Sequence, residues 1–227
     1  MATLHRLFTL AVRRGHLDRN PAAQVTVEYD DNGRDRVISP PEQVKLLAEV
    51  NKDHGLHMRP MMILAYETGM RMGEIRAMRW ADVDFDRHVY RVPRSKNGTA
   101  RLVPLSERAE EALRAPIWWR RDSSYVFPAK KGEGHLGSVS HVFARIAERA
   151  DVEGVRFHDY RHTFCTRMTR QRGVNIIALQ EITGHRTLDM LKRYSHPSAE
   201  DKVALVRGTA DSFHTEEKAS GEASVTR

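Results

Sequence analysis

Apolar side chains recur every three or four residues along most of the chain, the spacing of a helix that buries one face. The first such stripe is Leu4, Leu7, Phe8 and Ala11, and it ends at Arg13-Arg14-Gly15. The periodicity predicts helices at residues 3–14, from Ser39 onward, and at 60–67, 72–78, 106–114, 138–150, 158–171, 175–183 and 188–194.

Local capping signals support several of these boundaries. Ser39 can cap the helix that follows it, Pro40 suits a first turn, and Glu42 completes a capping box. Glycines at 69, 173 and 184 are predicted to end helices, and Thr187 is a possible cap for the helix after it.

The period changes between residues 88 and 104. Polar and apolar side chains alternate in His88-Val89-Tyr90-Arg91-Val92, which is typical of a strand. Asn97-Gly98 is a hairpin signal, and Arg101-Leu102-Val103-Pro104 would be the returning strand. We therefore predict a mainly α fold with a small antiparallel β-sheet, an α+β class.

Four segments follow from these patterns. Residues 1–24 hold a helix too short to bury a core alone, which is expected to be the last element of an otherwise missing N-terminal domain. Residues 25–38 are a predicted linker and residues 39–207 a mostly helical domain. Residues 208–227 are polar and are expected to be disordered.

Composition adds a preference for polyanions. The 227 residues carry a formal net charge of +7, with a net of −2 in residues 208–227, so the body is more basic than the whole. Basic domains of this size often bind nucleic acid, although a basic protein without such a partner fits equally.

Other bulk features bear on location. The single cysteine, Cys165, excludes an intramolecular disulfide and fits a reducing compartment. No signal peptide is visible, and the longest strongly apolar run, Met61 to Tyr66, is too short to span a bilayer. We expect a cytoplasmic protein with no membrane partner.

Two patterns in the first half of the chain could bind phosphate. Arg71 stands between Gly69 and Gly73 near a helix start, where glycines let backbone approach a ligand and helix amides favour an anion. Glu74, one turn on, could hold Arg71, or the two could form an ordinary solvated pair. Lys96, at the hairpin tip, could reach a neighbouring groove or could simply keep the loop soluble.

Two more patterns lie in the last third. His158 and Arg161 are spaced to share the first turn of a helix, which would join a titratable group to a phosphate site, while Asp159 and His162 are expected to point elsewhere as structural residues. Further on, Gly184-His185 forms a turn between two helices and Tyr194 follows one short helix later. A tyrosine at that spacing is also an ordinary core residue.

The order of these patterns is more specific than any one of them. The succession is Arg71, Lys96, His158-x-x-Arg161, Gly184-His185 and Tyr194. It resembles the tyrosine recombinase family, also called phage-type integrases, over about residues 39–196. The flanking Trp80-Ala81-Asp82-Val83-Asp84 and Val126-Phe127-Pro128 are similar to that family as well.

The resemblance implies a site-specific DNA recombinase that cleaves and rejoins strands through a 3′-phosphotyrosine, without cofactor, metal or ATP. Arg71 and Arg161 would grip the scissile phosphate, and His185 would hydrogen-bond it. Lys96 would protonate the leaving 5′ oxygen, His158 would assist proton transfer at the nucleophile, and Tyr194 would attack phosphorus.

The same resemblance implies partners. Double-stranded DNA is the expected substrate, with other recombinase subunits joining on it as a tetramer in the synapse, while the free protein is expected to be a monomer. Residues 198–207 could form a short helix that packs into a neighbouring subunit or on its own domain. Residues 3–23 resemble only the final helix of the family's N-terminal clamp, so the chain is expected to be truncated, a gene fragment or a minimal member.

Three alternatives remain open at this point. A type IB topoisomerase uses the same kinds of residue to relax supercoils, and a non-catalytic DNA-binding remnant would lack strand cleavage altogether. A zinc metallopeptidase would use His158 and His162 as ligands with Glu181 as a third, but it would leave Arg71, Lys96 and Tyr194 unexplained.

Overall fold

The computed structural model describes residues 2–25, 36–50, 57–93, 100–115, 123–129, 131–171 and 173–194, together with positions 199, 202, 203 and 206. The chain divides into two compact units, residues 1–35 and 36–227. The first contains α1 (Ala2–Arg13), on which Leu4, Leu7 and Leu10 are exposed. Asn20 closes the turn after α1 by donating from Nδ2 to the backbone oxygen of His5.

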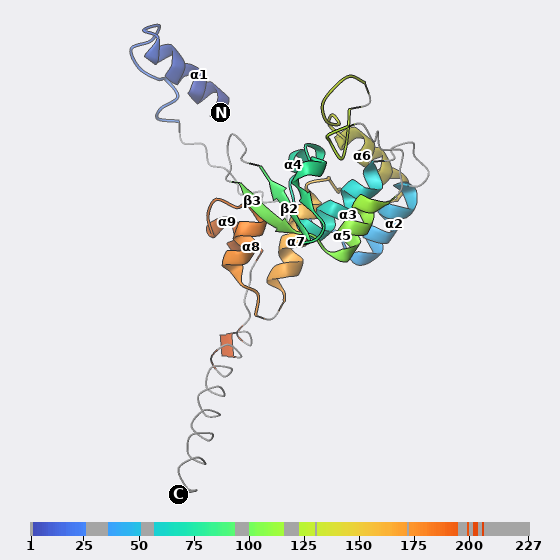
Figure 1. Ribbon diagram of the computed structural model, residues 1–227. Coiled ribbons are helices and arrows are strands. Elements are labelled where there is room, and N and C mark those ends of the chain that lie inside the picture. Colours follow the sequence, from blue (N-terminus) through green and yellow to red (C-terminus); the bar gives the residue numbers. More distant parts are fainter. Residues whose placement is uncertain are drawn as a thin grey trace, which may run out of the picture. The chain divides into compact units, whose positions relative to one another are not determined.

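The second unit is built around α3 (Met58–Thr68), which is buried along nearly its whole length. It packs against α5 (Glu107–Arg114) and α7 (Asp159–Thr169), while α2 (Pro40–Val50) lies against α3 and α6 (Ser140–Arg149) (Figure 1). The capping box predicted at the start of α2 is confirmed, because the Glu42 carboxylate accepts from the Ser39 backbone amide at 2.8 Å and Ser39 Oγ accepts from the Glu42 amide at 3.4 Å.

One small antiparallel sheet accompanies these helices. Its order is β1 (Val83–Asp84), β2 (Val89–Val92) and β3 (Arg101–Pro104), and Tyr90 pairs with Val103 across β2 and β3. The predicted hairpin and the α+β class are confirmed, whereas β1 and the 3-10 helix Trp80–Asp82 before it were not predicted. The hairpin tip, residues 94–99, lies outside the described residues.

Short helices complete the unit: α4 (Met72–Arg76), α8 (Ile176–Thr183) and α9 (Asp189–Lys192). α8 packs against β3, and a small apolar cluster of Phe164, Cys165, Leu179 and Leu191 joins α7, α8 and α9. The N-cap of α9 is Leu188 and carries no side-chain cap, so a Thr187 cap is wrong. The C-terminal segments predicted after residue 197 fall largely outside the described residues.

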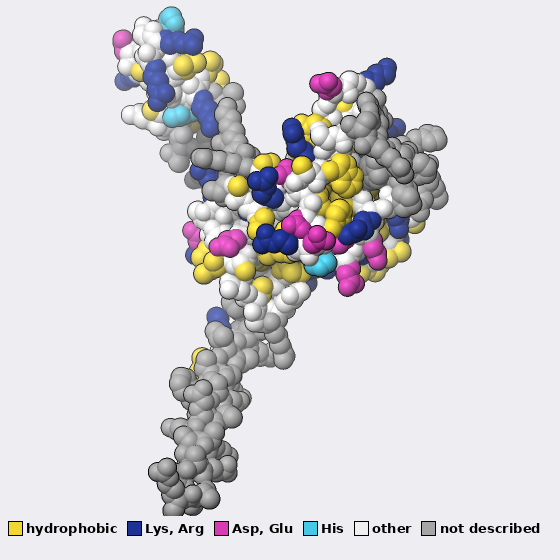
Figure 2. All heavy atoms as spheres, in the orientation of Figure 1, with side chains coloured by type: hydrophobic (Ala, Val, Ile, Leu, Met, Phe, Trp, Pro, Cys, Tyr) yellow, Lys and Arg dark blue, Asp and Glu magenta, His cyan; other side chains and the backbone are white. Residues whose placement is uncertain are grey.

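The surface charge and the hydropathy of the helices bear on the predictions of a basic surface and of no membrane span. On the visible face of the second unit, basic side chains alternate with acidic ones and form no continuous basic stripe among the described residues (Figure 2). None of the helices in the described part of the chain combines the length and apolar character needed to cross a bilayer.

Candidate active site

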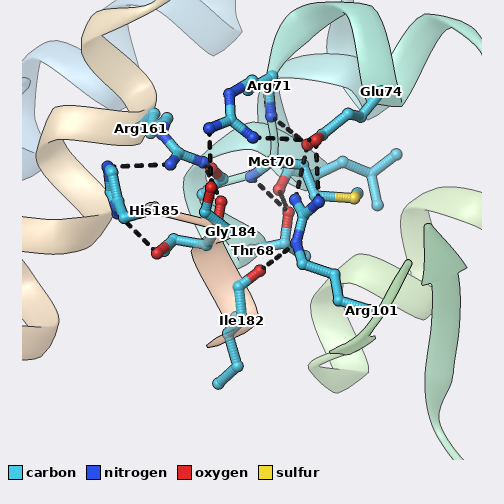
Figure 3. A network of polar contacts seen from close by, with 12 residues as sticks. Thr68, Met70, Arg71, Glu74, Arg101, Arg161, Ile182, Gly184 and His185 are labelled. Carbon is cyan, nitrogen blue, oxygen red and sulfur yellow. Dashed lines mark hydrogen bonds and ion pairs between the residues drawn. The ribbon is translucent and has the colours of Figure 1, made fainter. Parts of the chain in front are cut away.

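Arg71 is fixed at the junction of α3 and α4. Gly69 ends α3 in the left-handed conformation, and Arg71 is the N-cap residue of α4. Its Nη2 donates to the backbone oxygen of Gly184 at 2.9 Å, and its Nη1 donates to Glu74 Oε1 at 3.1 Å (Figure 3). Glu74 therefore holds Arg71 as expected, and the side chain is still 41% exposed, which leaves it accessible to a ligand.

Arg161 is buried, and it contacts the backbone at the ends of the two helices next to Arg71. Its Nη1 donates to the backbone oxygens of Gly69 at 3.0 Å and Thr183 at 2.6 Å, so one guanidinium joins the ends of α3 and α8. Burial, followed by repulsion from Arg71, lowers the pKa of Arg161 to about 10. Two cations held this close are electrostatically unfavourable alone, and a bound anion would relieve the repulsion.

His185 is the third member of this group. Arg161 Nη2 lies 2.9 Å from His185 Nε2, and because a guanidinium can only donate, Nε2 must accept. The ring proton is then on Nδ1, which donates to Thr183 Oγ1 at 2.8 Å. Burial, then Arg161 and Arg71, lower the pKa of His185 to about 3, so the ring is neutral at physiological pH.

Tyr194 stands beside these groups, in the turn after α9. Its ring centroid lies 6.2 Å from that of His185, and its hydroxyl lies 2.7 Å from Nδ1 of His162. The prediction that His162 points elsewhere is wrong, because one helical turn carries both His158 and His162 to this side of α7. Asp159 is structural as expected, since it is buried and accepts from the Arg156 amide at 2.7 Å.

Sequence reasoning also missed Arg101. From the start of β3 it donates to both carboxylate oxygens of Glu74, at 2.9 and 2.7 Å, and to the backbone oxygen of Ile182 at 2.8 Å. Burial alone would raise the pKa of Glu74, but Arg101 and then Arg71 together outweigh it, and the pKa lies below its usual value. Arg101 thus fixes the carboxylate that holds Arg71, through a pairing of positions 27 residues apart that no local motif reveals.

Gly69 and Gly184 are explained better by the packing around them than by the close approach of a ligand. A Cβ on Gly69 would come within 2.3 Å of the Phe164 ring, and one on Gly184 would meet the Arg101 guanidinium at 3.1 Å. Both residues have positive φ angles, which disfavour any side chain. Gly73 alone in this region has open space around its Cα, as the expected ligand approach would require.

The structure thus gathers most of the predicted site residues. Those brought together are Arg71, His158, Arg161, His185 and Tyr194. Lys96 lies outside the described residues. In the part of the chain that the structure describes, no three His, Cys, Asp or Glu side chains are grouped as a metal site would require.

Comparison with known proteins places this chain in the family that its sequence resembles. The family model for the phage integrase family matches residues 36–201. The shufflon-specific DNA recombinase of Escherichia coli is 32% identical over 197 residues, covering 86% of this chain and 49% of that protein. Tyrosine recombinase XerC of Xanthomonas campestris pv. campestris (strain B100) is 32% identical over 198 residues, covering 82% of this chain and 58% of its own length.

Solved structures share the fold at lower identity. The Tn1549 transposon integrase in complex with transposon right end DNA has a TM-score of 0.70 at 20% identity, covering 91% of this chain and 76% of that one. A lambda integrase dimer bound to a COC′ core site has a TM-score of 0.62 at 22% identity, covering 86% and 57%. The chain spans about half the length of the curated relatives it matches.

Proposed function

Because this chain belongs to the phage integrase family, we propose that it is the catalytic part of a site-specific DNA recombinase that cuts and rejoins strands through Tyr194. The observation that carries the proposal is the meeting of two guanidinium groups, Arg71 and Arg161, with His185 at one end and the Tyr194 ring alongside. The topoisomerase and zinc peptidase alternatives are not favoured, since the matched relatives are recombinases.

The arginines supply the charge that phosphoryl transfer needs. Attack on a phosphodiester builds negative charge on the nonbridging oxygens, and preorganised donors stabilise that charge. Arg161 is held by backbone carbonyls and Arg71 by Glu74, so neither has to reorganise when the phosphate arrives. The proposed chemistry draws its positive charge from these two side chains and needs no metal.

His185 has an additional part in this scheme. Its Nε2 accepts from Arg161 and its Nδ1 donates to Thr183, so it orients the guanidinium. Donation to the phosphate would require a proton on Nε2, either by protonation or by a change of tautomer, and the negative charge of the phosphate favours both. Lys96 is proposed to protonate the leaving 5′ oxygen.

The substrate and partners follow from this activity. We infer double-stranded DNA as substrate, a tetramer of recombinase subunits in the synapse, and a monomer when free. A DNA substrate also favours the cytoplasmic location expected from the sequence. Residues 1–24 are proposed as the last helix of an N-terminal domain, 25–38 as a linker, 39–207 as the catalytic domain and 208–227 as a polar tail.

A library of nicked suicide duplexes with a randomised core tests the proposal without knowledge of the target site. We expect a protein–DNA adduct that survives boiling in detergent, is formed in EDTA, and disappears in Tyr194→Phe, which keeps the ring and removes only the nucleophilic oxygen. An adduct formed equally by Tyr194→Phe would refute the assignment of the nucleophile.

A further inference from the structure

The hydroxyl of Tyr194 is hydrogen-bonded to a residue outside the predicted site. His162 Nδ1 lies 2.7 Å from it, and the two ring centroids are 5.5 Å apart with the rings tilted by 48°. We propose that His162 is a catalytic residue that receives the phenolic proton as Tyr194 attacks phosphorus. The inference rests on the proposed function and adds to it the group that activates the nucleophile.

The contact is fixed from both sides. The Tyr194 backbone amide donates to the oxygen of Leu191 at 2.9 Å, and its backbone oxygen accepts from Thr169 Oγ1 at 2.6 Å. The ring packs against the small apolar cluster that joins α7, α8 and α9. His162 follows the anchored Arg161 on α7, so its position is set by the same helix that holds the phosphate-binding guanidinium.

The protonation states of Tyr194 and His162 suit a proton donor and a proton acceptor. Burial, with a smaller contribution from Cys165, raises the pKa of Tyr194 to about 12, against the opposing effect of Arg193 and Arg161. The hydroxyl is therefore protonated at neutral pH and needs an acceptor before it can attack.

His162 is able to be that acceptor. Burial and then the neighbouring His158 lower its pKa, Asp159 acts in the opposite direction, and Arg193 and Arg161 lower it further. The ring is consequently neutral near pH 7, with Nδ1 free to accept once the ring proton is on Nε2. His185 also faces Tyr194, but its Nε2 is occupied by Arg161.

In this arrangement His158 contacts His162, which in turn contacts the nucleophile. Its ring centroid lies 5.2 Å from that of His162 with an interplanar angle of 83°, an edge-to-face contact. The family resemblance gives His158 the role of assisting proton transfer. In this structure the contact lets His158 act through His162, so we describe His158 as a positioning residue for the proton acceptor.

The chemical step balances. The Tyr194 O–H bond breaks as its oxygen bonds to phosphorus, and the proton moves to Nδ1 of His162, which becomes an imidazolium. The bond from phosphorus to the 5′ oxygen breaks, and that oxygen takes its proton from a separate donor, Lys96 in the proposed mechanism. In religation the 5′ oxygen bonds to phosphorus and gives its proton back to Lys96, while the bond from phosphorus to the tyrosine oxygen breaks and His162 returns its proton to that oxygen.

The test compares His162→Asn with His141→Asn in single-turnover adduct formation. Asn places an oxygen near the position of Nδ1 and can accept a hydrogen bond, but it cannot take a proton at neutral pH. His141 is an exposed histidine on α6 and provides the matched control. Thermal melts of both variants establish that each is folded before rates are compared.

We expect His162→Asn to slow adduct formation by about a hundredfold or more, the usual effect of losing a general base. The wild-type rate should fall as the pH drops through the His162 pKa, which lies below the ordinary histidine value, and this dependence should vanish in the variant. A substrate with a bridging 5′ sulfur, whose thiolate leaves without protonation, should not rescue His162→Asn, because the defect is on the nucleophile side.

Two results would overturn the inference. One is a His162→Asn rate and pH profile equal to those of the wild type and of His141→Asn. The other is full rescue by the 5′-sulfur substrate, which would place His162 on the leaving-group side. Failure of the proposed function has a different signature, since the wild-type chain itself would then form no adduct.

Discussion

At the scale of single residues, the two arginines of the site differ in what they do. Arg161 is 3% exposed and binds two backbone carbonyls and His185, so it is part of the structure as well as of the site. Arg71 is partly exposed and is held by one carboxylate and one carbonyl. A substitution at Arg71 consequently separates chemistry from folding more cleanly than one at Arg161.

We expect Arg71→Lys to retain the melting temperature within a few degrees and to slow adduct formation by about a hundredfold, the usual loss for one oxyanion donor. Lysine keeps the charge but cannot make the two-pronged contact of a guanidinium. Arg145→Lys, at an exposed position on α6, is the matched control. Equal rates for both variants would show that Arg71 does not contact the scissile phosphate.

At the scale of elements, the end of α3 determines where the site forms. Gly69 terminates the helix, supplies a carbonyl to Arg161, and has no room for a side chain because Phe164 of α7 covers it. The close approach of α3 and α7 at this point is therefore what sets Arg161 opposite Arg71.

Gly69→Ala should destabilise the second unit by about 3 kcal/mol, from the strain of a left-handed alanine and from the overlap with Phe164. Gly154→Ala is the control, since Gly154 has a similar φ of 62° and nothing within 4 Å of its Cβ position. Urea unfolding should show the control losing about 1 kcal/mol, the conformational cost alone. Equal losses would mean that contact with Phe164 contributes nothing.

The elements also show which features were predictable. Ser39 with Glu42, Gly69 and Gly184 are signals read within one turn of the chain, and each marks a real helix boundary. Contacts between distant positions carry no such local signature: His162 meets Tyr194 across 32 residues. Strand β1 was missed because two residues are too short to display alternation. The local contact between Arg71 and Glu74 was therefore predictable, but the contacts between distant positions, such as those of Arg101 and His162, were not.

At the scale of the whole molecule, three histidines of the site, of which His185 is buried, make the fold sensitive to acid. Burial is the largest effect lowering the pKa of His158, His162 and His185, so the folded state favours their neutral forms. The unfolded chain binds these protons as the pH falls below about 6.5, whereas the folded chain binds them only at lower pH. The stability that they contribute is present above that value and is lost as the solution becomes acidic.

We expect the free energy of unfolding to fall by about 2 kcal/mol between pH 7 and pH 5 from His185 alone, because its pKa is lowered to about 3. Urea titrations at the two pH values measure this difference, and His185→Gln should reduce it. A carboxylate such as Glu42, whose pKa is lowered to about 2 mainly by its hydrogen bond with Arg36, keeps its contribution across this window and loses it only at lower pH. An unchanged pH slope in His185→Gln would contradict the assignment.

DNA binding is a second property of the molecule as a whole. The net charge is +7, but the visible face of the second unit mixes both signs, and the chain spans about half of its relatives' length. We expect Tyr194→Phe to bind duplex DNA weakly, with log affinity falling linearly against log salt concentration as counterions are released. Nanomolar affinity that is insensitive to salt would disagree with this expectation.

The central claim is that the phenolic oxygen of Tyr194 forms the covalent bond to DNA. Peptide mapping of the adduct tests this claim most directly. Trypsin should release Tyr194 in a peptide that runs to Lys202, in which it is the only tyrosine. After nuclease digestion, mass spectrometry should find that peptide carrying a 3′-phosphorylated nucleotide on Tyr194. A nucleotide on any other residue, such as the neighbouring Ser195 or His196, would contradict the account.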